Sequence, residues 1–361
     1  MANKAISKSY DSISLPQVVD LIEAIGSEVT VLIQGHIGSG KSSIHKILQE
    51  RFPDHYPVYF DCTTKADSGD ISVPKFKTIN GQDVVSFIPN EELGLHQDKP
   101  ILLMIDELGK NKAILNALTR LMLERKLGTQ ELPKGSIVFA TTNLGLENVG
   151  DLLPAHVRNR VCVVKMEKPG AMQWVEDFAI PNNLHPVAIG TVIEYPSMFE
   201  SFEDVEDPNS NPDIFHPKQH RAAFVTHRTM HKASDILKAT EHLSDSVRIH
   251  ALAGVIGESA AMKLMTISRL NDDMPAYERM LADPTGCPLP KSGVSACMMV
   301  AKMAMRVERE TFDDCLTYLG RMSKEVQALF ARTIMRSPKK NLAASHKKFV
   351  DWAASNMYLF S

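Results

Sequence analysis

A glycine-rich segment between two apolar runs constrains this chain more than any other feature. Gly35–Ser42 reads GHIGSGKS and matches G-x-x-x-x-G-K-[ST] at every fixed position. It follows the β-prone run VTVLIQ and precedes IHKILQERF, in which apolar residues recur at helical spacing. A strand, a glycine loop and a helix in this order predict a phosphate-binding loop, because this is the context that distinguishes such a loop from a tight turn with a surface lysine.

Each fixed position of the motif has a chemical reason. The glycines let backbone N–H groups turn toward phosphates, helped by the positive end of the following helix. Lys41 would neutralise phosphate charge, and the Ser42 hydroxyl would bind Mg²⁺. The expected ATP-binding residues are Gly35, Gly38, Ser39, Gly40, Lys41, Ser42 and Ser43, with Lys41 also acting in catalysis.

Five short apolar runs in the first half predict the strands of one parallel sheet. They are nearly continuous in apolar residues rather than alternating, as expected for strands that are covered on both faces. Helical patterns at Ser43–Arg51 and Ala113–Lys126 lie between them, so the fold class is expected to be α/β. The five runs are Val29–Ile33, Val58–Phe60, Ile101–Ile105, Ile137–Thr141 and Val161–Val164.

The chain length predicts more than one domain, since 361 residues exceed what one hydrophobic core usually supports. The nucleotide domain is expected over residues 1–195, with an inserted hairpin at about 74–89 around an Asn-Gly turn. Residues 196–217 are rich in proline, asparagine and acids, which favours an exposed linker. Residues 218–361 show helical spacing throughout and are expected to form a lid and further helices.

Charge and cysteine content argue against several classes of protein. A formal net charge of −3 gives no general attraction for nucleic acid or an anionic membrane. The five cysteines are widely spaced and include no C-x-x-C pair, so neither a disulfide framework nor a zinc site is indicated. The N-terminal MANKAISKSYDS lacks an apolar signal core, and no run approaches the roughly 20 apolar residues of a membrane helix. We therefore expect a cytoplasmic protein without a membrane partner.

Two adjacent acids follow the third apolar run. The segment ILLMIDEL is an apolar strand that ends in Asp106 and Glu107. At the carboxyl end of a strand beside the phosphate loop, Asp106 can hold Mg²⁺ through water, and Glu107 can orient and deprotonate the attacking water. An acid pair in this place is otherwise a helix cap or the start of a loop. The complete phosphate loop upstream favours the catalytic interpretation.

Polar residues after the later strands extend the candidate site. Asn143 comes two positions after the fourth apolar run, and its amide can hold the attacking water near the terminal phosphate. Arg158 and Arg160 stand just before the fifth run, and Arg228 begins a helical pattern beyond the acidic segment. Any one of these arginines alone would be a surface charge.

In this order, the motifs resemble those of the AAA+ ATPases, specifically the MoxR-like branch, over roughly Leu15 to Ala239. DELGKNKAILNALTRLMLERKLG is similar to the acid pair and long helix of that branch, and ATTN is similar to sensor 1. NRV at Asn159–Val161 resembles the arginine-finger region, and HRTMHKASDIL resembles sensor 2. The Asn80-Gly81 hairpin falls where the family inserts a hairpin into helix 2.

The resemblance implies an ATPase that uses ATP and Mg²⁺ and assembles into a ring, commonly a hexamer, with ATP between subunits. Arg160, with Arg158 as the alternative, would reach the terminal phosphate held by the neighbouring subunit. Arg228 would contact nucleotide from the lid of its own subunit. Turnover would drive the remodelling or assembly of a protein partner, often one with a von Willebrand factor A domain.

Some features depart from the family pattern. His36-Ile37 stands where Pro-Pro or Pro-Gly is frequent, and Leu144 follows the sensor asparagine where proline is usual. Neither change removes a chemical group. The acidic segment before the lid is long, and the chain after about Leu270 matches no motif of the family.

Two other functions remain open. One is a nucleic-acid motor or loader on the same fold, for which Lys75 and Lys77 beside the hairpin turn are the only hint. The other is an ATP-dependent assembly scaffold with little turnover, against which the intact Glu107 argues. The partner's identity lies in surfaces that the motifs do not encode.

Overall fold

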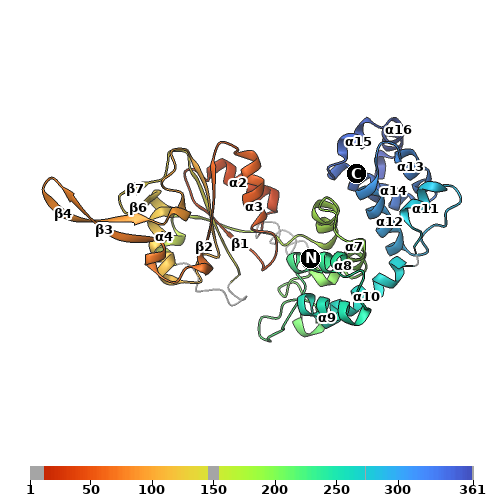
Figure 1. The fold of residues 1–361 in the computed structure, drawn as a ribbon, viewed down its shortest axis with the longest axis horizontal. Coiled ribbons are helices and arrows are strands. Elements are labelled where there is room, and N and C mark those ends of the chain that lie inside the picture. Colours follow the sequence, from red (N-terminus) through yellow and green to blue (C-terminus); the bar gives the residue numbers. More distant parts are fainter. Residues whose placement is uncertain (1–11, 145–153, 273, 360–361) are drawn as a thin grey trace. The chain divides into compact units, whose positions relative to one another are not determined.

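The computed structural model describes residues 12–144, 154–272 and 274–359. The chain divides into two compact units, Met1–Lys168 and Pro169–Ser361 (Figure 1). The sequence placed the end of the first domain near residue 195, whereas residues 171–194 belong to the second unit, because their apolar side chains join the core of the C-terminal helices.

A five-stranded parallel sheet forms the centre of the first unit. Its strand order is β2-β5-β8-β1-β9, and every neighbouring pair is parallel. Each strand overlaps one predicted apolar run, and β5 is buried along its whole length. The predicted α/β fold with a parallel sheet is therefore confirmed. The strands are β1 (Val31–Gln34), β2 (Tyr56–Asp61), β5 (Ile101–Asp106), β8 (Ile137–Thr142) and β9 (Cys162–Lys165).

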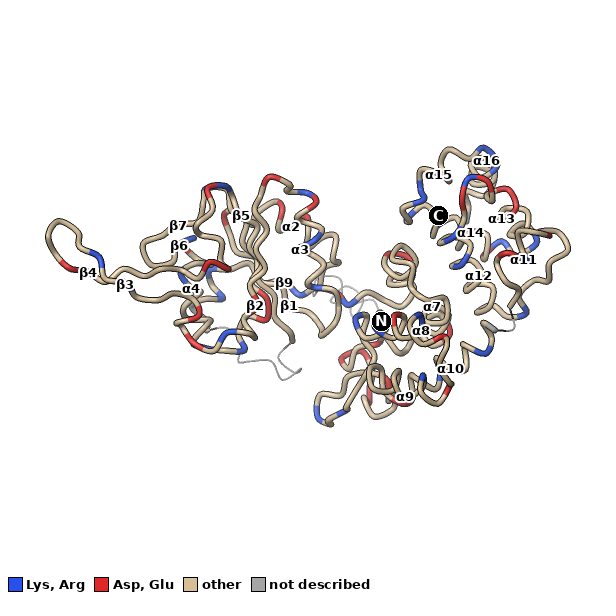
Figure 2. Tube along the Cα trace, in the orientation of Figure 1, with Lys and Arg blue, Asp and Glu red and all other residues tan. Residues whose placement is uncertain are grey.

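A separate antiparallel hairpin extends away from this sheet and consists of β3 (Ser72–Ile79) and β4 (Gln82–Pro89) (Figure 1). Asn80 and Gly81 form its turn with φ of 53° and 79°, the two positive angles of a type I′ turn. Figure 2 shows few charges along it. Seven large apolar side chains on the hairpin are exposed: Val73, Phe76, Ile79, Val84, Val85, Phe87 and Ile88.

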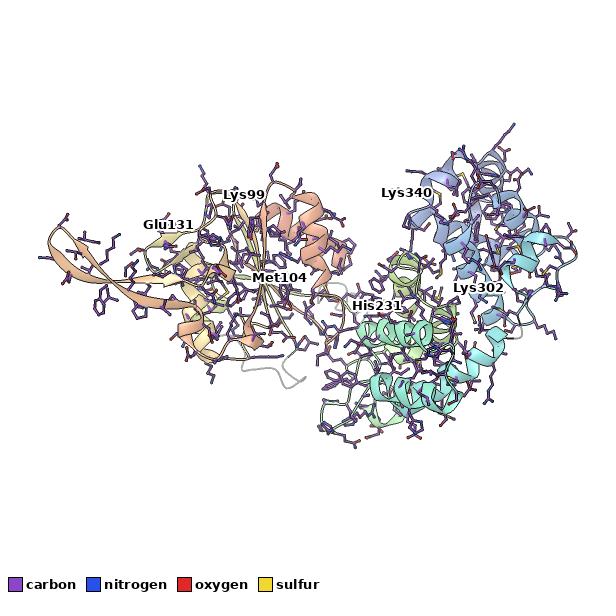
Figure 3. The ribbon with its side chains drawn as sticks, viewed as in Figure 1. Lys99, Met104, Glu131, His231, Lys302 and Lys340 are labelled. Carbon is purple, nitrogen blue, oxygen red and sulfur yellow. The ribbon has the colours of Figure 1, made fainter. Side chains whose placement is uncertain are left out.

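Helices cover both faces of the parallel sheet. α2 (Leu15–Ile25) and α3 (Ser43–Arg51) share one core with Met104 of β5, which lies fully buried in the middle of the sheet (Figure 3). α4 (Lys112–Glu124) shares a second core with Leu103 of the same strand. Because neighbouring side chains of a strand point to opposite faces, the two cores lie on opposite sides of the sheet.

The C-terminal end of α4 comes two residues before the end of the helical pattern that the sequence predicts at Ala113–Lys126. The helix ends at Glu124, and Arg125 takes the left-handed conformation with φ of 57°. The Arg125 guanidinium donates to Thr30 Oγ1 at 2.7 Å, a contact that helps to hold this conformation. Gly128, with φ of 60°, lies in the turn that follows. That turn joins two short antiparallel strands, β6 (Lys126–Leu127) and β7 (Gln130–Glu131).

The second unit is helical and has one continuous hydrophobic core. Met298, Met299 and Met303 are fully buried in that core, so they fill space rather than line a groove. Within the described ranges of both units, no helix is long and apolar enough to cross a membrane. The helices are α6 (Ala171–Trp174) with a π-helical turn at Val175–Ala179, α7 (Pro186–Glu194), α8 (His227–Ala239), α9 (Asp245–Ile256), α10 (Glu258–Asp272), α11 (Tyr277–Ala282), α12 (Gly293–Arg306), α13 (Phe312–Leu319), α14 (Lys324–Arg336), α15 (Lys340–Ser345) and α16 (Lys347–Ser355).

The acidic segment 196–217 packs more closely than its composition suggests. Met198 and Ile214 are 0% and 1% exposed, so two apolar side chains anchor the segment to the unit. The buried Asp213 carboxylate accepts from Lys263 Nζ of α10 at 2.5 Å. These contacts hold a segment that the sequence presented as an exposed linker.

Candidate nucleotide-binding site

The loop between β1 and α3 has the backbone geometry that a phosphate cradle needs. Gly38 and Gly40 have φ of 69° and 94°, a region that L side chains rarely adopt. The N–H groups of Gly38, Gly40 and Ser42 have no hydrogen-bond acceptor in the part of the chain that the structure describes. These donors lie at the N-terminal end of α3, where the helix dipole favours an anion.

Ser39 gives a second indication that the loop suits an oxyanion. Its side chain is 2% exposed, and its hydroxyl has no partner among residues 12–144, 154–272 and 274–359. A buried hydroxyl without a partner is costly. A phosphate oxygen would accept from this hydroxyl as well as from the neighbouring N–H groups, so the loop fits the triphosphate that the sequence predicts.

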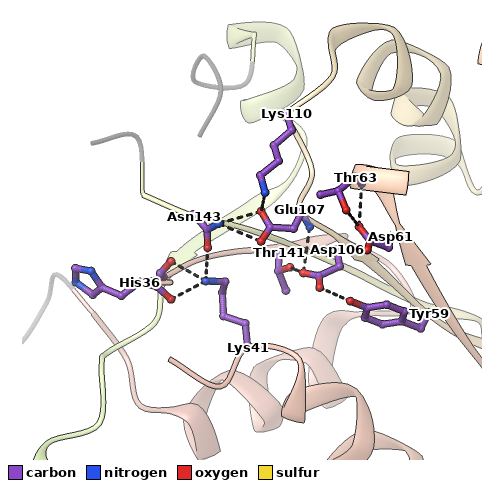
Figure 4. Close-up of polar contacts among 11 residues, drawn as sticks. His36, Lys41, Tyr59, Asp61, Thr63, Asp106, Glu107, Lys110, Thr141 and Asn143 are labelled. Carbon is purple, nitrogen blue, oxygen red and sulfur yellow. Dashed lines mark hydrogen bonds and ion pairs between the residues drawn. The ribbon is translucent and has the colours of Figure 1, made fainter. Parts of the chain in front are cut away.

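A series of hydrogen bonds connects Lys41 through the Asn143 amide to Glu107 (Figure 4). Lys41 is 7% exposed, and its Nζ donates to Gly35 O at 2.8 Å, to His36 O at 2.8 Å and to Asn143 Oδ1 at 2.7 Å. Asn143 Nδ2 donates to the two carboxylate oxygens of Glu107 at 3.1 and 2.9 Å. The structure thus brings together three residues that the sequence placed in one site, although 102 positions separate Lys41 from Asn143.

The groups on either side of the Asn143 amide fix the orientation of this amide. Lys41 can only donate, and an ionised carboxylate can only accept. The amide oxygen must therefore face Lys41 and the amide nitrogen must face Glu107. Among the common side chains, an amide suits this place because it carries a donor and an acceptor side by side.

Glu107 is held by backbone as well as by side-chain contacts. Its φ of 56° is in the left-handed region, which is uncommon for a residue other than glycine. The next residue, Leu108, donates its N–H to Thr141 O of the neighbouring strand at 2.9 Å. Lys110 Nζ lies 3.0 Å from Glu107 Oε2, a contact that the sequence reading did not anticipate. Such unusual backbone angles cluster at functional sites.

Asp106 turns to a different set of partners. Its side chain is 7% exposed at the end of β5. Tyr59 OH donates to Oδ2 at 2.5 Å, Thr141 Oγ1 donates to Oδ1, and the N–H of Glu107 donates to Oδ1 at 3.1 Å. The two adjacent acids therefore have separate side-chain surroundings.

Tyr59 and Thr141 were missed in the sequence, although each lies on a strand beside β5. The register pairs Asp61 of β2 with Asp106, and Tyr59 precedes Asp61 by two residues on the same face. Thr141 comes from β8, the neighbour on the other side. The sequence showed only polar residues near the ends of two strands. It did not indicate that these strands lie on either side of β5.

The donor set fits Mg²⁺ in the way that the sequence proposed. Ser42 offers a hydroxyl and Asp106 a carboxylate, and both are the oxygen ligands that this ion prefers. Within the described residues, no group of three or more His, Cys, Asp or Glu side chains could hold a metal by itself. Mg²⁺ is commonly bound by one or two carboxylates together with substrate phosphates, so a sparse protein ligand set is what a nucleotide-dependent metal site requires.

Burial determines the charge of two neighbouring groups. It lowers the pKa of His45 on α3, whose Nε2 lies 3.3 Å from Leu102 O. Burial raises the pKa of the Cys62 thiol to about 12, and the carboxylates of Asp61, Asp106 and Glu107 raise it further. A neutral imidazole and a neutral thiol add no charge to the site.

The three predicted arginines belong to other elements of the chain. Arg158 ends the short helix α5 (Ala155–Arg158), Arg160 stands just before β9, and both are exposed. Arg228 is exposed on α8, which belongs to the second unit. Their predicted contacts with nucleotide stay predictions.

The fold and the loop define the first unit as an α/β P-loop domain, and it is followed by a helical region. No family model matches the chain, and no curated protein matches it. Among solved structures, it is similar to RuvB of Thermotoga maritima. A proline-to-glycine variant of that protein aligns at 13% identity over 84% of this chain and 90% of that chain, with a TM-score of 0.37.

A second structure, described as the RuvB Holliday junction branch migration motor of the same organism, aligns at 14% identity. The alignment covers 85% of this chain and 86% of that chain, with a TM-score of 0.34. TM-scores this low do not assign a function to this chain, so its function has to be inferred from the geometry of the site.

Proposed function

We propose that this chain is a Mg²⁺-dependent ATPase of the AAA+ type, related to the MoxR-like branch. The observation that carries the proposal is the bonded series Lys41, Asn143 and Glu107, with Asp106 next to it at the end of β5. It joins a phosphate-binding cation, a water-positioning amide and a general base at one edge of a parallel sheet.

Each residue has a role that follows from its contacts. Lys41 would exchange one of its present acceptors for a phosphate oxygen, while the free N–H groups of the loop hold the other phosphates. Asn143 fixes the direction of the Glu107 carboxylate, which accepts a proton from the attacking water. Ser42 and Asp106 would hold Mg²⁺, which when bound neutralises charge on the phosphates.

Two substitutions test the site. Lys41→Ala should abolish ATP binding in a folded protein, whereas Glu107→Gln should keep ATP binding and stop turnover. Lys46→Ala is a matched control, because Lys46 is exposed on α3 five positions beyond Lys41. Unchanged ATP affinity in folded Lys41→Ala, or parental turnover in Glu107→Gln, would refute the assignment.

We also propose that Arg160 completes the site of a neighbouring subunit in a head-to-tail ring, with Arg158 as the alternative. A heterologous interface of this kind closes into a ring when the rotation allows. An arginine supplied in trans can contribute on the order of 10³–10⁵ in rate. Arg160→Ala should still bind ATP and lose turnover.

Mixing Arg160→Ala with Lys41→Ala subunits tests the sharing of the site. Some interfaces in such mixtures combine an intact loop with an intact arginine, so part of the ATPase rate should return. The rate is measured across mixing ratios after native mass spectrometry has verified mixed oligomers. No recovery in verified mixed rings, or full activity of a monomeric wild-type protein, would rule out the shared site.

The exposed hairpin favours a protein partner over nucleic acid. Pairing of Phe76 with Val85 and of Pro74 with Phe87 places these four side chains on one face of the hairpin. Phe76 is 82% exposed, and an isolated two-stranded hairpin is only marginally stable in water. An apolar face of this kind fits an apolar protein surface, including that of a von Willebrand factor A domain.

Hairpin variants separate the two partner classes. Phe76→Ser should weaken capture of a protein partner and leave the basal ATPase unchanged, because Phe76 lies outside the site. Lys75→Gln with Lys77→Gln should have little effect on that capture. If DNA or RNA instead binds the wild type, and the lysine variant loses this binding, the chain is a nucleic-acid motor.

A further inference from the structure

The hydrogen bonds to Asp106 leave one lone-pair position of its carboxylate without a donor among the described residues. An ionised carboxylate offers about four lone-pair positions. Thr141 Oγ1 and the Glu107 N–H both donate to Oδ1, and Tyr59 OH donates to Oδ2. The position that remains for a metal-bound water is therefore on Oδ2, beside the Tyr59 hydroxyl.

Tyr59 reaches this place from a neighbouring strand. Its side chain projects from β2 on the face that Asp61 and Asp106 share, and its hydroxyl meets Oδ2 at 2.5 Å (Figure 4). The residue is 47% exposed, so its ring is not simply filling the core. A half-exposed ring with its hydroxyl on a buried carboxylate points to a role in fixing that carboxylate.

The Tyr59 ring also lies against the helix that follows the phosphate loop. Its centroid is 6.2 Å from that of His45, which is buried on α3. Ser42, the other expected Mg²⁺ ligand, directly precedes the first residue of this helix. Tyr59 thus contacts Asp106 by its hydroxyl and packs by its ring against the helix that begins next to Ser42.

We propose that Tyr59 is a positioning residue for the Mg²⁺ site, which sets the direction in which Asp106 Oδ2 receives a metal-bound water. The inference rests on the proposed function, since it concerns the metal of the same nucleotide site. Tyrosine suits the task because its neutral hydroxyl fixes the carboxylate without cancelling the charge that attracts the cation. Without this donor, Thr141 and the Glu107 N–H still hold Oδ1, whereas Oδ2 keeps its charge and loses the hydrogen bond that directs it.

The test compares Tyr59→Phe with Tyr56→Phe. Phenylalanine keeps the ring beside His45 and removes only the hydroxyl. Tyr56 lies on the same strand and is 38% exposed, and its hydroxyl makes no hydrogen bond within the described residues, so Tyr56→Phe is a matched control. Both changes are made in full-length Glu107→Gln protein to prevent turnover, and ATP binding is measured by calorimetry in EDTA and across a MgCl₂ titration.

We expect Tyr59→Phe to raise the MgCl₂ concentration for half-maximal enhancement of ATP binding about tenfold, the size of one hydrogen bond to a charged group. Affinity in EDTA and the unfolding temperature in EDTA should match those of Tyr56→Phe. An unchanged or lowered MgCl₂ requirement overturns the inference, as does an equal loss of ATP affinity in EDTA, which would indicate a general structural role. If the Glu107→Gln parent binds no ATP in either buffer, the proposed function itself is wrong.

Discussion

Asn143→Asp is the most informative change at the site, because it removes the donor that faces Glu107 and keeps an acceptor that faces Lys41. Aspartate has nearly the shape of asparagine and still offers an oxygen to Lys41 Nζ, now 2.7 Å from Asn143 Oδ1. At the other end, the Nδ2 donor that lies 2.9 Å from Glu107 Oε2 becomes a carboxylate oxygen. An attraction is thereby replaced by a repulsion with almost no change in volume.

The size of this repulsion follows from the distance. Two unit charges about 2.9 Å apart repel by about 6 kcal/mol at an effective dielectric constant of about 20. The pair avoids this energy by taking up a proton or by moving apart. Lys41 favours the charged form of the new aspartate, and Lys110 favours that of Glu107. In either case, Glu107 ceases to be an oriented base.

The expected result is a loss of turnover on the order of 10²-fold or more, the size seen when a catalytic group is misplaced by about 1 Å. Asn143→Ala removes both contacts without adding charge, so it should retain more activity than Asn143→Asp. Steady-state ATPase rates of the two variants decide this, with ATP affinity measured separately in EDTA. Asn111→Asp is a control for added charge, because aspartate still caps α4 through its oxygen and loses only the hydrogen bond from Asn111 Nδ2 to Ala66 O. Wild-type turnover in Asn143→Asp, or higher turnover than in Asn143→Ala, would refute the view that the amide donor orients Glu107.

Three other predictions concern stability and reactivity. Phe330→Ala should destabilise the second unit by about 3–5 kcal/mol, because Phe330 is fully buried in its core, and a lower thermal midpoint in calorimetry would reveal this. Burial lowers the pKa of His185 to about 4, helped by the cations Lys302, Arg248 and Lys238, so the unfolded state binds the extra proton and stability should fall by about 3 kcal/mol from pH 6.5 to pH 4. Denaturant titrations at several pH values should show this slope in the wild type and a flatter one in His185→Asn. Cys62, with its pKa raised to about 12, should resist iodoacetamide at pH 8 in the native protein and react in urea, as peptide mass spectrometry can follow.

The parts of the fold that follow from local patterns could be predicted from the sequence. A strand covered on both faces needs a continuous apolar run, and the run at Ile101–Ile105 became the fully buried β5. The turn at Asn80 and Gly81 needs two positive φ angles, which this pair adopts more readily than others. The phosphate loop is local in the same sense, since its glycines, lysine and serine are consecutive in the chain.

Contacts that depend on the order of strands could not be predicted in the same way. Tyr59 meets Asp106 only because β2 lies beside β5, and Thr141 meets it only because β8 lies on the other side. The apolar runs do not indicate which strands are neighbours in the sheet. Lys110 was nearer in sequence, but a lysine three residues after a glutamate at a loop is usually a surface pair.

The division between the units illustrates a second limit. α7 is apolar on almost every side, with Val187, Ile189 and Val192 all fully buried. The sequence of such a helix predicts that it is buried but does not indicate in which core. The acidic composition after it suggested a domain boundary at its end. The observed division after Lys168 depends instead on packing against helices more than 60 residues away, because α7 shares its core with α10 and α12.

The three acceptors of Lys41 have a consequence for the proposed reaction. An ammonium group has three donors, and Gly35 O, His36 O and Asn143 Oδ1 use all of them. A phosphate must therefore displace one of these acceptors. The two carbonyls belong to the loop that holds Lys41, whereas Asn143 follows β8 and can release the ammonium without deforming the loop. Its oxygen would then be free to accept from the attacking water, while its nitrogen still directs Glu107. Loading of the loop and orientation of the base would in this way be coupled through one amide, so we expect the loss of this amide to cost more than the loss of either of its hydrogen bonds alone.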